Sequence, residues 1–323
     1  MKQKWFSALS EDNLGETFTK HYERFKEGYR AWFLKEGEFN RPTFKACDKA
    51  LKQHLPELYP QWEKICNIID ADDIDARLLS LYCPTPYVTG CSQAVWLKSM
   101  PILVRNYDYD LNLSEGVCLK TKWHGKTVIA MTDCIWGVLD GMNDDGLVVS
   151  LSFGGRGDVG KGFGIPIILR YILEFCSTVP EAIEVLSRVP THMSYNVTLL
   201  DASGMYKTLE ISPLSPPILL DIPIAVNHQG NFALTNYAIF SKSYERRQQL
   251  LNKLQDPLMN VDAFIGSFEY SPLFVSNYDG GFGTIYTAVY NPTWRAMELR
   301  WPHGIKMIQS FEHFEPMDVL VQY

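Results

Sequence analysis

Apolar residues in the first quarter of the chain follow helical spacing. Aromatic side chains recur at intervals of four and three residues between Phe18 and Phe25, which places them on one face of a helix. A second apolar series begins after Pro42, and a third helix is predicted over residues 61–81. The pattern therefore predicts that residues 1 to about 80 are helical.

The pattern changes after Cys83. Two prolines in Pro84-Thr85-Pro86 end any helix, and short runs rich in β-branched residues follow. Strands are predicted at 102–104, 126–130, 146–151, 196–200 and 205–210. The last two are separated by Asp201-Ala202-Ser203-Gly204, whose turn residues predict a hairpin.

Helical segments interrupt the strand-rich part of the chain at three places. They are predicted near residues 165–176, 180–189 and 244–251. Proline in the first turn, with Glu181 beside it, suits the start of the second of these helices. Runs of strands with clustered helices predict a layered α+β fold and not an alternating βαβ one.

Composition and charge narrow the class of protein. The chain has 323 residues, of which 46% are hydrophobic and 21% charged, and its formal net charge is -7. This profile is typical of a globular protein and argues against a general nucleic-acid binder, which needs a basic surface. No segment is apolar over the length of a bilayer crossing, and the first residues lack the apolar core of a secretory signal.

The seven cysteines and seven histidines do not form a recognisable ligand pattern. The cysteines are odd in number, scattered, and without a CxxC pair, so neither a disulfide framework nor a zinc site is predicted. No histidine shows HxH or HExxH spacing. We therefore expect a cytoplasmic protein without a cofactor.

A glycine-rich loop at 155–162 follows a predicted strand and resembles the phosphate-binding pattern GxxxxGK. A nucleotide-binding loop needs Ser or Thr directly after the lysine to hold magnesium, and Gly162 occupies that position here. A flexible loop that faces the substrate is the better interpretation.

Gly90-Cys91-Ser92 is the strongest candidate for chemistry. Gly90 leaves its carbonyl open to attack by the neighbouring thiol, because it has no side chain. If the Gly90–Cys91 bond is cut, one residue supplies both a thiol nucleophile and an amine base. An α-amino group titrates near ~7.7–8.0, so part of it is neutral at physiological pH and no histidine is needed.

Two charged residues on the next predicted strand can assist Cys91. Arg105 offers a positive charge that favours the thiolate, and Asp108 offers a carboxylate to orient the amine. A surface ion pair between them is an equally good interpretation of the spacing. Aromatic residues nearby favour an acyl chain or an aromatic acyl group as substrate, or are simply core; they include Trp96, Tyr107, Trp136, Phe153 and Phe163.

An ordered set of motifs resembles a known family. The set comprises Gly90-Cys91-Ser92, Arg105-Asn106-Tyr107-Asp108, Gly141–Leu147, Asp201–Gly204 with Glu210, Val226-Asn227-His228 and Gly281–Tyr286. In this order the motifs resemble the penicillin acyltransferase family of Ntn-hydrolases, the C45 autoprocessing peptidases, which are related to the choloylglycine hydrolases. The resemblance spans residues 83 to about 300. It implies an αββα sandwich and a terminal cysteine that acts on linear amides or thioesters.

The resemblance also implies roles for individual residues. Cys91 is nucleophile and base, Arg105 and Asp108 position it, and Asn227 contributes to the oxyanion hole. Ser152 stands where the bile-salt branch has asparagine and is the candidate second donor of the oxyanion hole, with a shorter reach. Residues 280–290 lack that branch's late arginine. Bile salts are therefore a poor expectation for the substrate.

The resulting hypothesis is a self-processing cysteine hydrolase or acyltransferase. Residues 1–90 form a helical prosegment, and residues 91–323 form the catalytic segment after cleavage between Gly90 and Cys91. The acyl-enzyme is resolved by water or by an amine, and the sequence does not separate the two. Two alternatives stay open: a relative that never cleaves and binds a ligand, and a conventional cysteine hydrolase that uses His228.

Overall fold

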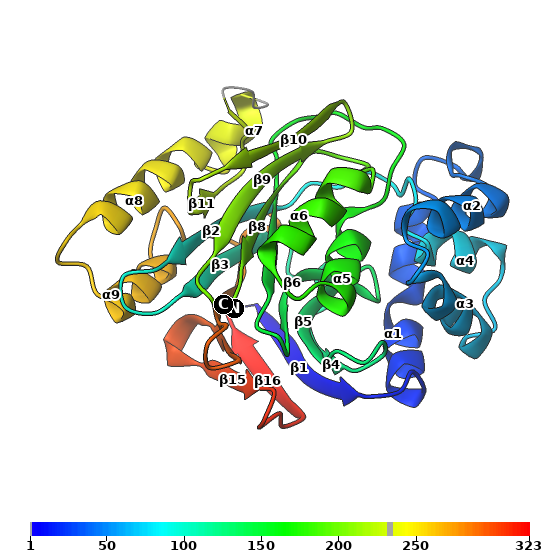
Figure 1. Cartoon of the computed structure of the whole chain (residues 1–323), viewed down its shortest axis with the longest axis horizontal. Helices are drawn as coiled ribbons and strands as arrows, with labels where there is room; N and C mark the ends of the chain where they lie inside the picture. Colours follow the sequence, from blue (N-terminus) through cyan, green and yellow to red (C-terminus); the bar gives the residue numbers. More distant parts are fainter. Residues whose placement is uncertain (1, 231–234) are drawn as a thin grey trace.

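The computed structural model describes residues 2–230 and 235–323, and it confirms most of the predicted helices. In the first quarter of the chain the helices are α1 (Glu16–Phe33), α2 (Phe44–His54), α3 (Tyr59–Ile68) and α4 (Asp73–Leu79). The single helix expected over 61–81 is two helices, because Asp70 adopts a left-handed φ of 50° and Asp72 caps the start of α4 with its side chain. These helices lie together at one end of the molecule (Figure 1).

The prediction that residues 1–80 are entirely helical is wrong at the N-terminus. Residues Gln3–Glu11 form strand β1, which lies parallel to β4 (Val117–Thr121) and antiparallel to β16 (Met317–Gln322). Phe6, Ser7 and Ala8 in the middle of β1 are buried, while Trp5 before them is half exposed. The strand is short and carries no clear alternation of buried and exposed residues, so its sequence did not distinguish it from the helical pattern that follows.

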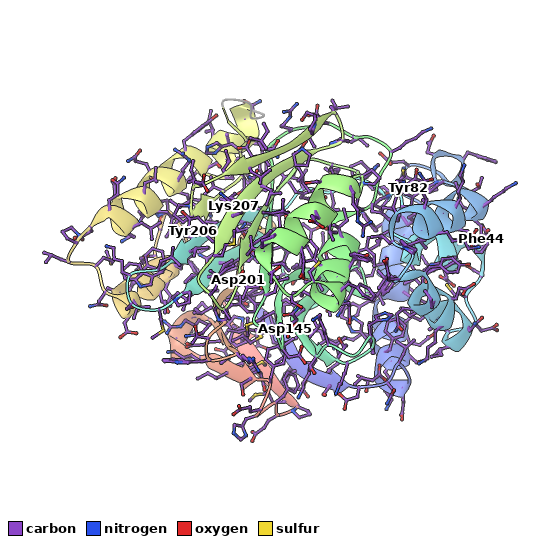
Figure 2. All side chains as sticks on the ribbon, in the orientation of Figure 1. Phe44, Tyr82, Asp145, Asp201, Tyr206 and Lys207 are labelled. Carbon is purple, nitrogen blue, oxygen red and sulfur yellow. The ribbon has the colours of Figure 1, made fainter. Side chains whose placement is uncertain are left out.

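The larger sheet has nine strands among the described residues. Its spatial order is β10-β9-β8-β7-β6-β5-β4-β1-β16. The members not yet given are β5 (Val128–Asp133), β6 (Gly137–Asn143), β7 (Val148–Phe153), β8 (Tyr195–Leu200), β9 (Tyr206–Ser212) and β10 (Ser215–Leu220). The predicted hairpin is confirmed: the Asp201 carboxylate accepts hydrogen bonds from the backbone N–H groups of Ser203 and Met205 at the turn between β8 and β9. Asp201 is labelled in Figure 2.

The smaller sheet carries the candidate nucleophile. Its spatial order is β11-β2-β3-β13-β14-β15, and β12 pairs with β13. These strands are β2 (Gly90–Trp96), β3 (Ile102–Tyr109), β11 (Ile224–Ala225), β12 (Ser276–Asn277), β13 (Phe282–Asn291), β14 (Ala296–Arg300) and β15 (Lys306–Ser310).

Helices cover the outer face of each sheet, which makes the predicted αββα sandwich. Helices α5 (Ile165–Phe175) and α6 (Val179–Arg188) pack on the larger sheet. The smaller sheet is covered by α8 (Ser243–Gln255) with α7 (Thr235–Phe240) and α9 (Val261–Gly266) nearby (Figure 1). Short 3₁₀ turns lie at Glu38–Asn40, Ser267–Glu269 and Pro302–Gly304.

Polar as well as apolar side chains join the two sheets. The Gln93 amide on β2 donates to the Thr198 hydroxyl on β8 at 2.8 Å and to the Ser150 carbonyl on β7 at 3.3 Å. Because buried polar groups lose free energy unless they are paired, these bonds fix how the sheets face each other. The α+β class and the four-layer arrangement that we predicted are confirmed.

Candidate active site

Cys91 lies at the start of β2, with its side chain between the two sheets. It pairs directly with Tyr107 on β3, and Gly90 pairs with Asp108. Since neighbours along a strand point to opposite faces, Cys91, Arg105 and Tyr107 share the inner face. The thiol is fully buried in the intact chain.

The Arg105 guanidinium is the hydrogen-bond donor to the thiol. Its Nη2 lies 3.1 Å from Sγ of Cys91. Burial raises the pKa of the Cys91 thiol, and this effect outweighs the opposing positive charge of Arg105. The thiol is therefore held protonated at neutral pH in the intact chain, beside a guanidinium whose positive charge favours the thiolate.

A buried carboxylate and two tyrosines hold Arg105 in place. Asp140 on β6 bonds Nη1 of Arg105, which also donates to the Leu139 carbonyl at 2.8 Å. The hydroxyls of Tyr286 and Tyr290 donate to the same carboxylate at 2.6 and 2.7 Å. All four side chains are excluded from solvent, so the guanidinium has little freedom to leave the thiol.

Asn227 contacts Cys91, the candidate nucleophile. Its Oδ1 accepts the Cys91 backbone N–H at 2.9 Å, and its Nδ2 donates to the Phe153 carbonyl over a long 3.4 Å. In the intact chain the asparagine therefore holds the nitrogen that would become the terminal amine. The amide donor that an oxyanion hole requires points at Phe153 instead.

Asp108 is on the opposite face of β3 from Arg105. Its carboxylate accepts hydrogen bonds from Arg246 of α8 and from the Thr284 hydroxyl, each at 2.6 Å. Asp108 and Arg246 are both fully buried. The alternative interpretation, that Arg105 and Asp108 form a surface ion pair, is therefore wrong. Asp108 still lies near enough to raise the pKa of the Cys91 thiol.

Gly90 is required by close packing. A Cβ at this position would lie 2.3 Å from the Phe282 ring and 3.1 Å from the Cβ of Asp108. Phe282 cannot simply move away, because its ring packs on Phe240 with centroids 4.6 Å apart. The carbonyl of Gly90 is thus held beside the thiol under an aromatic cover.

We expect Gly90→Ala to lose about 1–3 kcal/mol of unfolding free energy and to slow any cleavage before Cys91, because the new methyl group displaces Phe282. Thermal melting and the fraction of cleaved chain measure the two effects. Gly266→Ala is the matched control, since its Cβ meets nothing within 4 Å. Phe282→Leu should partly rescue the variant, and unchanged cleavage and stability in Gly90→Ala would contradict this packing.

Tyr237 of α7 covers the peptide before Cys91. Its hydroxyl donates to the Thr89 carbonyl at 2.6 Å, and its ring meets Phe153 edge to face at 5.3 Å. Tyr237 and the Phe282 ring together close this side of the site. Access to Cys91 therefore requires residues 87–90 or α7 to move.

A cavity of about 170 Å³ lies on the same sheet face as Cys91, beyond Tyr107. The Tyr107 ring is 5.9 Å from Tyr109, which lines the cavity together with Phe25 and Trp32 of α1. Tyr107 and Phe153, two of the predicted pocket residues, are therefore near the site.

Trp96 and His228 lie away from these contacts, whereas the Ser152 hydroxyl bonds the residue that precedes Asn227. Trp96 packs on Phe264 in the core under α9, on the other face of the sheet, because it is five residues from Cys91. The Ser152 hydroxyl donates to the Val226 carbonyl at 2.9 Å. The His228 ring stacks on Tyr244, and its Nδ1 bonds the Ser243 hydroxyl.

A buried acid cluster joins α1 to the rest of the protein. The Tyr29 hydroxyl lies 2.5 Å from Glu115 and 3.0 Å from Asp133, and His21 pairs with Glu115 at 3.0 Å. The Tyr87 hydroxyl donates to Asp133 as well. Burial and the charge of Glu115 raise the pKa of Asp133 to about 6.

This raised pKa predicts a pH-dependent stability. Between about pH 4 and 6 the folded state binds more protons at Asp133 than the unfolded chain, so the contribution of Asp133 to the unfolding free energy falls as the pH rises. Asp133→Asn removes this contribution, and we expect the variant to be more stable than the parent at pH 7, with the difference lost as the pH falls to about 4. Urea unfolding in a Cys91→Ala background measures this, and equal stability at pH 7 would contradict it.

Three functional candidates were missed from the sequence: Asp140, Tyr237 and Arg246. Asp140 could have been found, since it is a single carboxylate inside the apolar strand Gly137–Asn143. Arg246 shares a helical face with Leu250, but one arginine in a polar helix carries no clear signal. Tyr237 follows a segment without a recognisable motif.

Residues 2–230 and 235–323 contain neither a membrane-spanning helix nor a cluster of metal ligands. No helix among them is long and apolar enough to cross a membrane. In the same part of the chain, no group of three or more His, Cys, Asp and Glu side chains is arranged to hold a metal ion.

Several solved structures are similar to this chain at low sequence identity. Similar solved structures include penicillin V acylase from Agrobacterium tumefaciens, at 14% identity and TM-score 0.48, over 69% of this chain and 86% of that one. An N-acylethanolamine-hydrolyzing acid amidase ortholog from Caenorhabditis elegans has 16% identity and TM-score 0.47, over 72% and 100%. A mutant conjugated bile acid hydrolase from Clostridium perfringens has 12% identity and TM-score 0.41, over 72% and 97%. No curated protein matches the sequence.

The family model of acyl-coenzyme A:6-aminopenicillanic acid acyl-transferase matches residues 96–306. The match begins after Cys91, so Gly90 and Cys91 themselves lie outside it. It covers more than half of the chain and includes Arg105, Asp108 and Asn227. The protein therefore belongs to the acyl-coenzyme A:6-aminopenicillanic acid acyl-transferase family, as its ordered motifs predicted.

Proposed function

We propose that the protein is a self-processing N-terminal cysteine hydrolase or acyltransferase that cleaves linear amides or thioesters through an acyl-Cys91 intermediate. The observation that carries this proposal is the set of contacts around one residue. Arg105 donates to the Cys91 sulfur, and Asn227 holds the Cys91 nitrogen. Family membership supports acyl transfer as the type of reaction.

In the proposed self-cleavage, Sγ of Cys91 attacks the carbonyl carbon of Gly90. The carbon–nitrogen bond then breaks, the thiol proton ends on the Cys91 nitrogen, and Gly90 is held as a thioester. Water hydrolyses the thioester, which leaves a Gly90 carboxylate and a Cys91 with free thiol and free amine. Asn227 supports this step because its oxygen already binds the departing nitrogen.

The same atoms then act on substrate. The terminal amine takes the proton of the thiol, and the thiolate, stabilised by Arg105, attacks the substrate carbonyl. The leaving amine or thiol departs with a proton, and the acyl group stays on Sγ. Water or an acceptor amine then removes it and restores the thiol. A rotation of the Asn227 amide would turn its NH₂ group toward the oxyanion, at the cost of a long bond to Phe153.

The aromatic cavity beyond Tyr107 supports an apolar acyl group as substrate. Aromatic walls from α1 and from Tyr87 and Tyr109 suit an aliphatic chain or an aromatic ring. In our proposal, withdrawal of residues 87–90 after cleavage joins this cavity to Cys91. Seven unpaired cysteines support the cytoplasmic location proposed from the sequence.

We further propose that residues 1–90 stay bound after cleavage. Strand β1 is paired on both sides within the larger sheet. The Trp136 indole donates to the Leu79 carbonyl, and Glu115 and Asp133 bind Tyr29. Loss of the segment would expose two sheet edges and several buried polar groups.

Trapping the acyl-enzyme tests the proposed function. The purified protein is incubated with phenylacetyl and medium-chain acyl thioesters, quenched in acid and digested. We expect a peptide that begins with Cys91 and carries the acyl mass, which hydroxylamine removes. A full-length chain with no acylated Cys91 would instead favour the non-cleaving relative. An acyl group that disappears in His228→Ala would favour the cysteine–histidine hydrolase.

A further inference from the structure

A larger cavity, of about 520 Å³, lies behind the segment that carries Asn227. Its walls come from β9, β10, β11 and α8, and Val226 and His228 on either side of Asn227 line it. Cys91 and Arg105 do not line it. Its volume is within the range of small-molecule sites in proteins.

One side of this cavity is aliphatic. Ile218 and Leu220 of β10, with Ile222 and Ile224 beyond them, contribute branched apolar side chains. The ion pair between Lys207 of β9 and Asp221 ties the two walls together, and Lys207 is labelled in Figure 2. A ligand that fits here has an apolar body.

Two charges of opposite sign also line the cavity without neutralising each other. Arg247 forms no hydrogen bond or ion pair with another residue in the part of the chain described by the structure. Glu210 accepts the Gly230 N–H at 3.0 Å but has no cationic partner there. Burial and the charge of Arg247 lower the pKa of His228 to about 4, so the histidine is neutral at pH 7 and Arg247 is the cation.

Asn196 supplies a buried acceptor that lacks a donor. Its side chain is 1% exposed, and its Nδ2 donates to the carbonyls of Val226 at 2.7 Å and His228 at 3.2 Å. Its Oδ1 is buried below the cavity wall and has no hydrogen-bond partner in the described part of the chain. Asn196 therefore fixes the backbone of the two cavity residues that flank Asn227.

We propose that this cavity binds an apolar α-amino acid as a zwitterion. The ligand carboxylate pairs with Arg247, its ammonium group donates to Glu210, and its side chain lies on the aliphatic wall of Ile218 and Leu220. Arg247 thus gains an anionic partner, and Glu210 gains a cationic one. This site is separate from the proposed reaction at Cys91.

Isothermal titration calorimetry on full-length Cys91→Ala tests the proposal without turnover or self-cleavage. The probes are L-phenylalanine, 3-phenylpropionate (no amine) and phenethylamine (no carboxylate). We expect L-phenylalanine to bind about tenfold or more tightly than either analogue, because each missing charge removes a charged hydrogen bond. Arg247→Gln should weaken L-phenylalanine and 3-phenylpropionate but not phenethylamine.

Glu210→Gln should show the opposite selectivity, and Lys253→Gln, on α8 outside the cavity, should change nothing. Thermal melting confirms that each variant is folded. No saturable binding of L-phenylalanine at ~10 mM would overturn the proposal. So would affinities that Arg247→Gln and Glu210→Gln leave unchanged, or tighter binding of 3-phenylpropionate than of the amino acid.

Discussion

Replacing Cys91 with alanine should leave the chain at its full 37.0 kDa and reduce acyl transfer to the background rate. In the proposed mechanism the same sulfur cuts the Gly90–Cys91 bond and accepts the acyl group, so both functions are lost together. Loss of a nucleophile costs on the order of 10⁶ in turnover. Intact mass and product release from an acyl thioester measure the two losses.

Cys66→Ala is the matched control for this variant. Cys66 is a partly buried thiol on α3, in the cluster of helices at one end of the molecule, and its removal should leave cleavage and turnover unchanged. Cys91→Ser should cleave slowly and turn over poorly, because a hydroxyl is a weaker nucleophile than a thiol. Cleavage at the same bond in Cys91→Ala would show that another residue does the cutting.

Arg105→Lys should reduce turnover about 10- to 100-fold while the protein stays folded. Lysine keeps the positive charge, but it lacks the fork that lets arginine bond Asp140, the Leu139 carbonyl and the sulfur at the same time. Because the lysine ammonium would pair with Asp140, the Cys91 thiolate would lose its hydrogen-bond donor. The pH–rate profile should shift to higher pH, because the pKa of the terminal thiol rises.

Arg170→Lys separates this catalytic effect from simple loss of stability. Arg170 is also fully buried and pairs with Glu174 on α5, away from Cys91. We expect a comparable fall in melting temperature for the two variants and normal turnover only for Arg170→Lys. Equal turnover in both would contradict a role for Arg105 at the thiol.

The sequence was sufficient for the layered fold because its strands and helices carry strong local signals. The β8–β9 hairpin has a turn with Asp201 and Gly204, and α6 begins with proline in its first turn. Strand β1 was missed because its pairing partners lie more than 100 residues away, at β4 and β16. Local spacing does not contain that information.

The site was predictable only in part for the same reason. Cys91, Arg105 and Asn227 were found through motifs, and the structure brings them together. Asp108 was expected to position Cys91 together with Arg105. The two residues are three positions apart on β3, so their side chains point to opposite faces of the sheet. On its own face of β3, Asp108 pairs with Arg246 of α8, which is 138 residues later in the sequence.

The central claim is tested most directly by N-terminal sequencing and intact mass of the purified protein. The account predicts two tightly associated fragments, one that ends at Gly90 and one whose first residue is Cys91. A single uncut chain that persists through prolonged incubation, or a new terminus at any other residue, would contradict it.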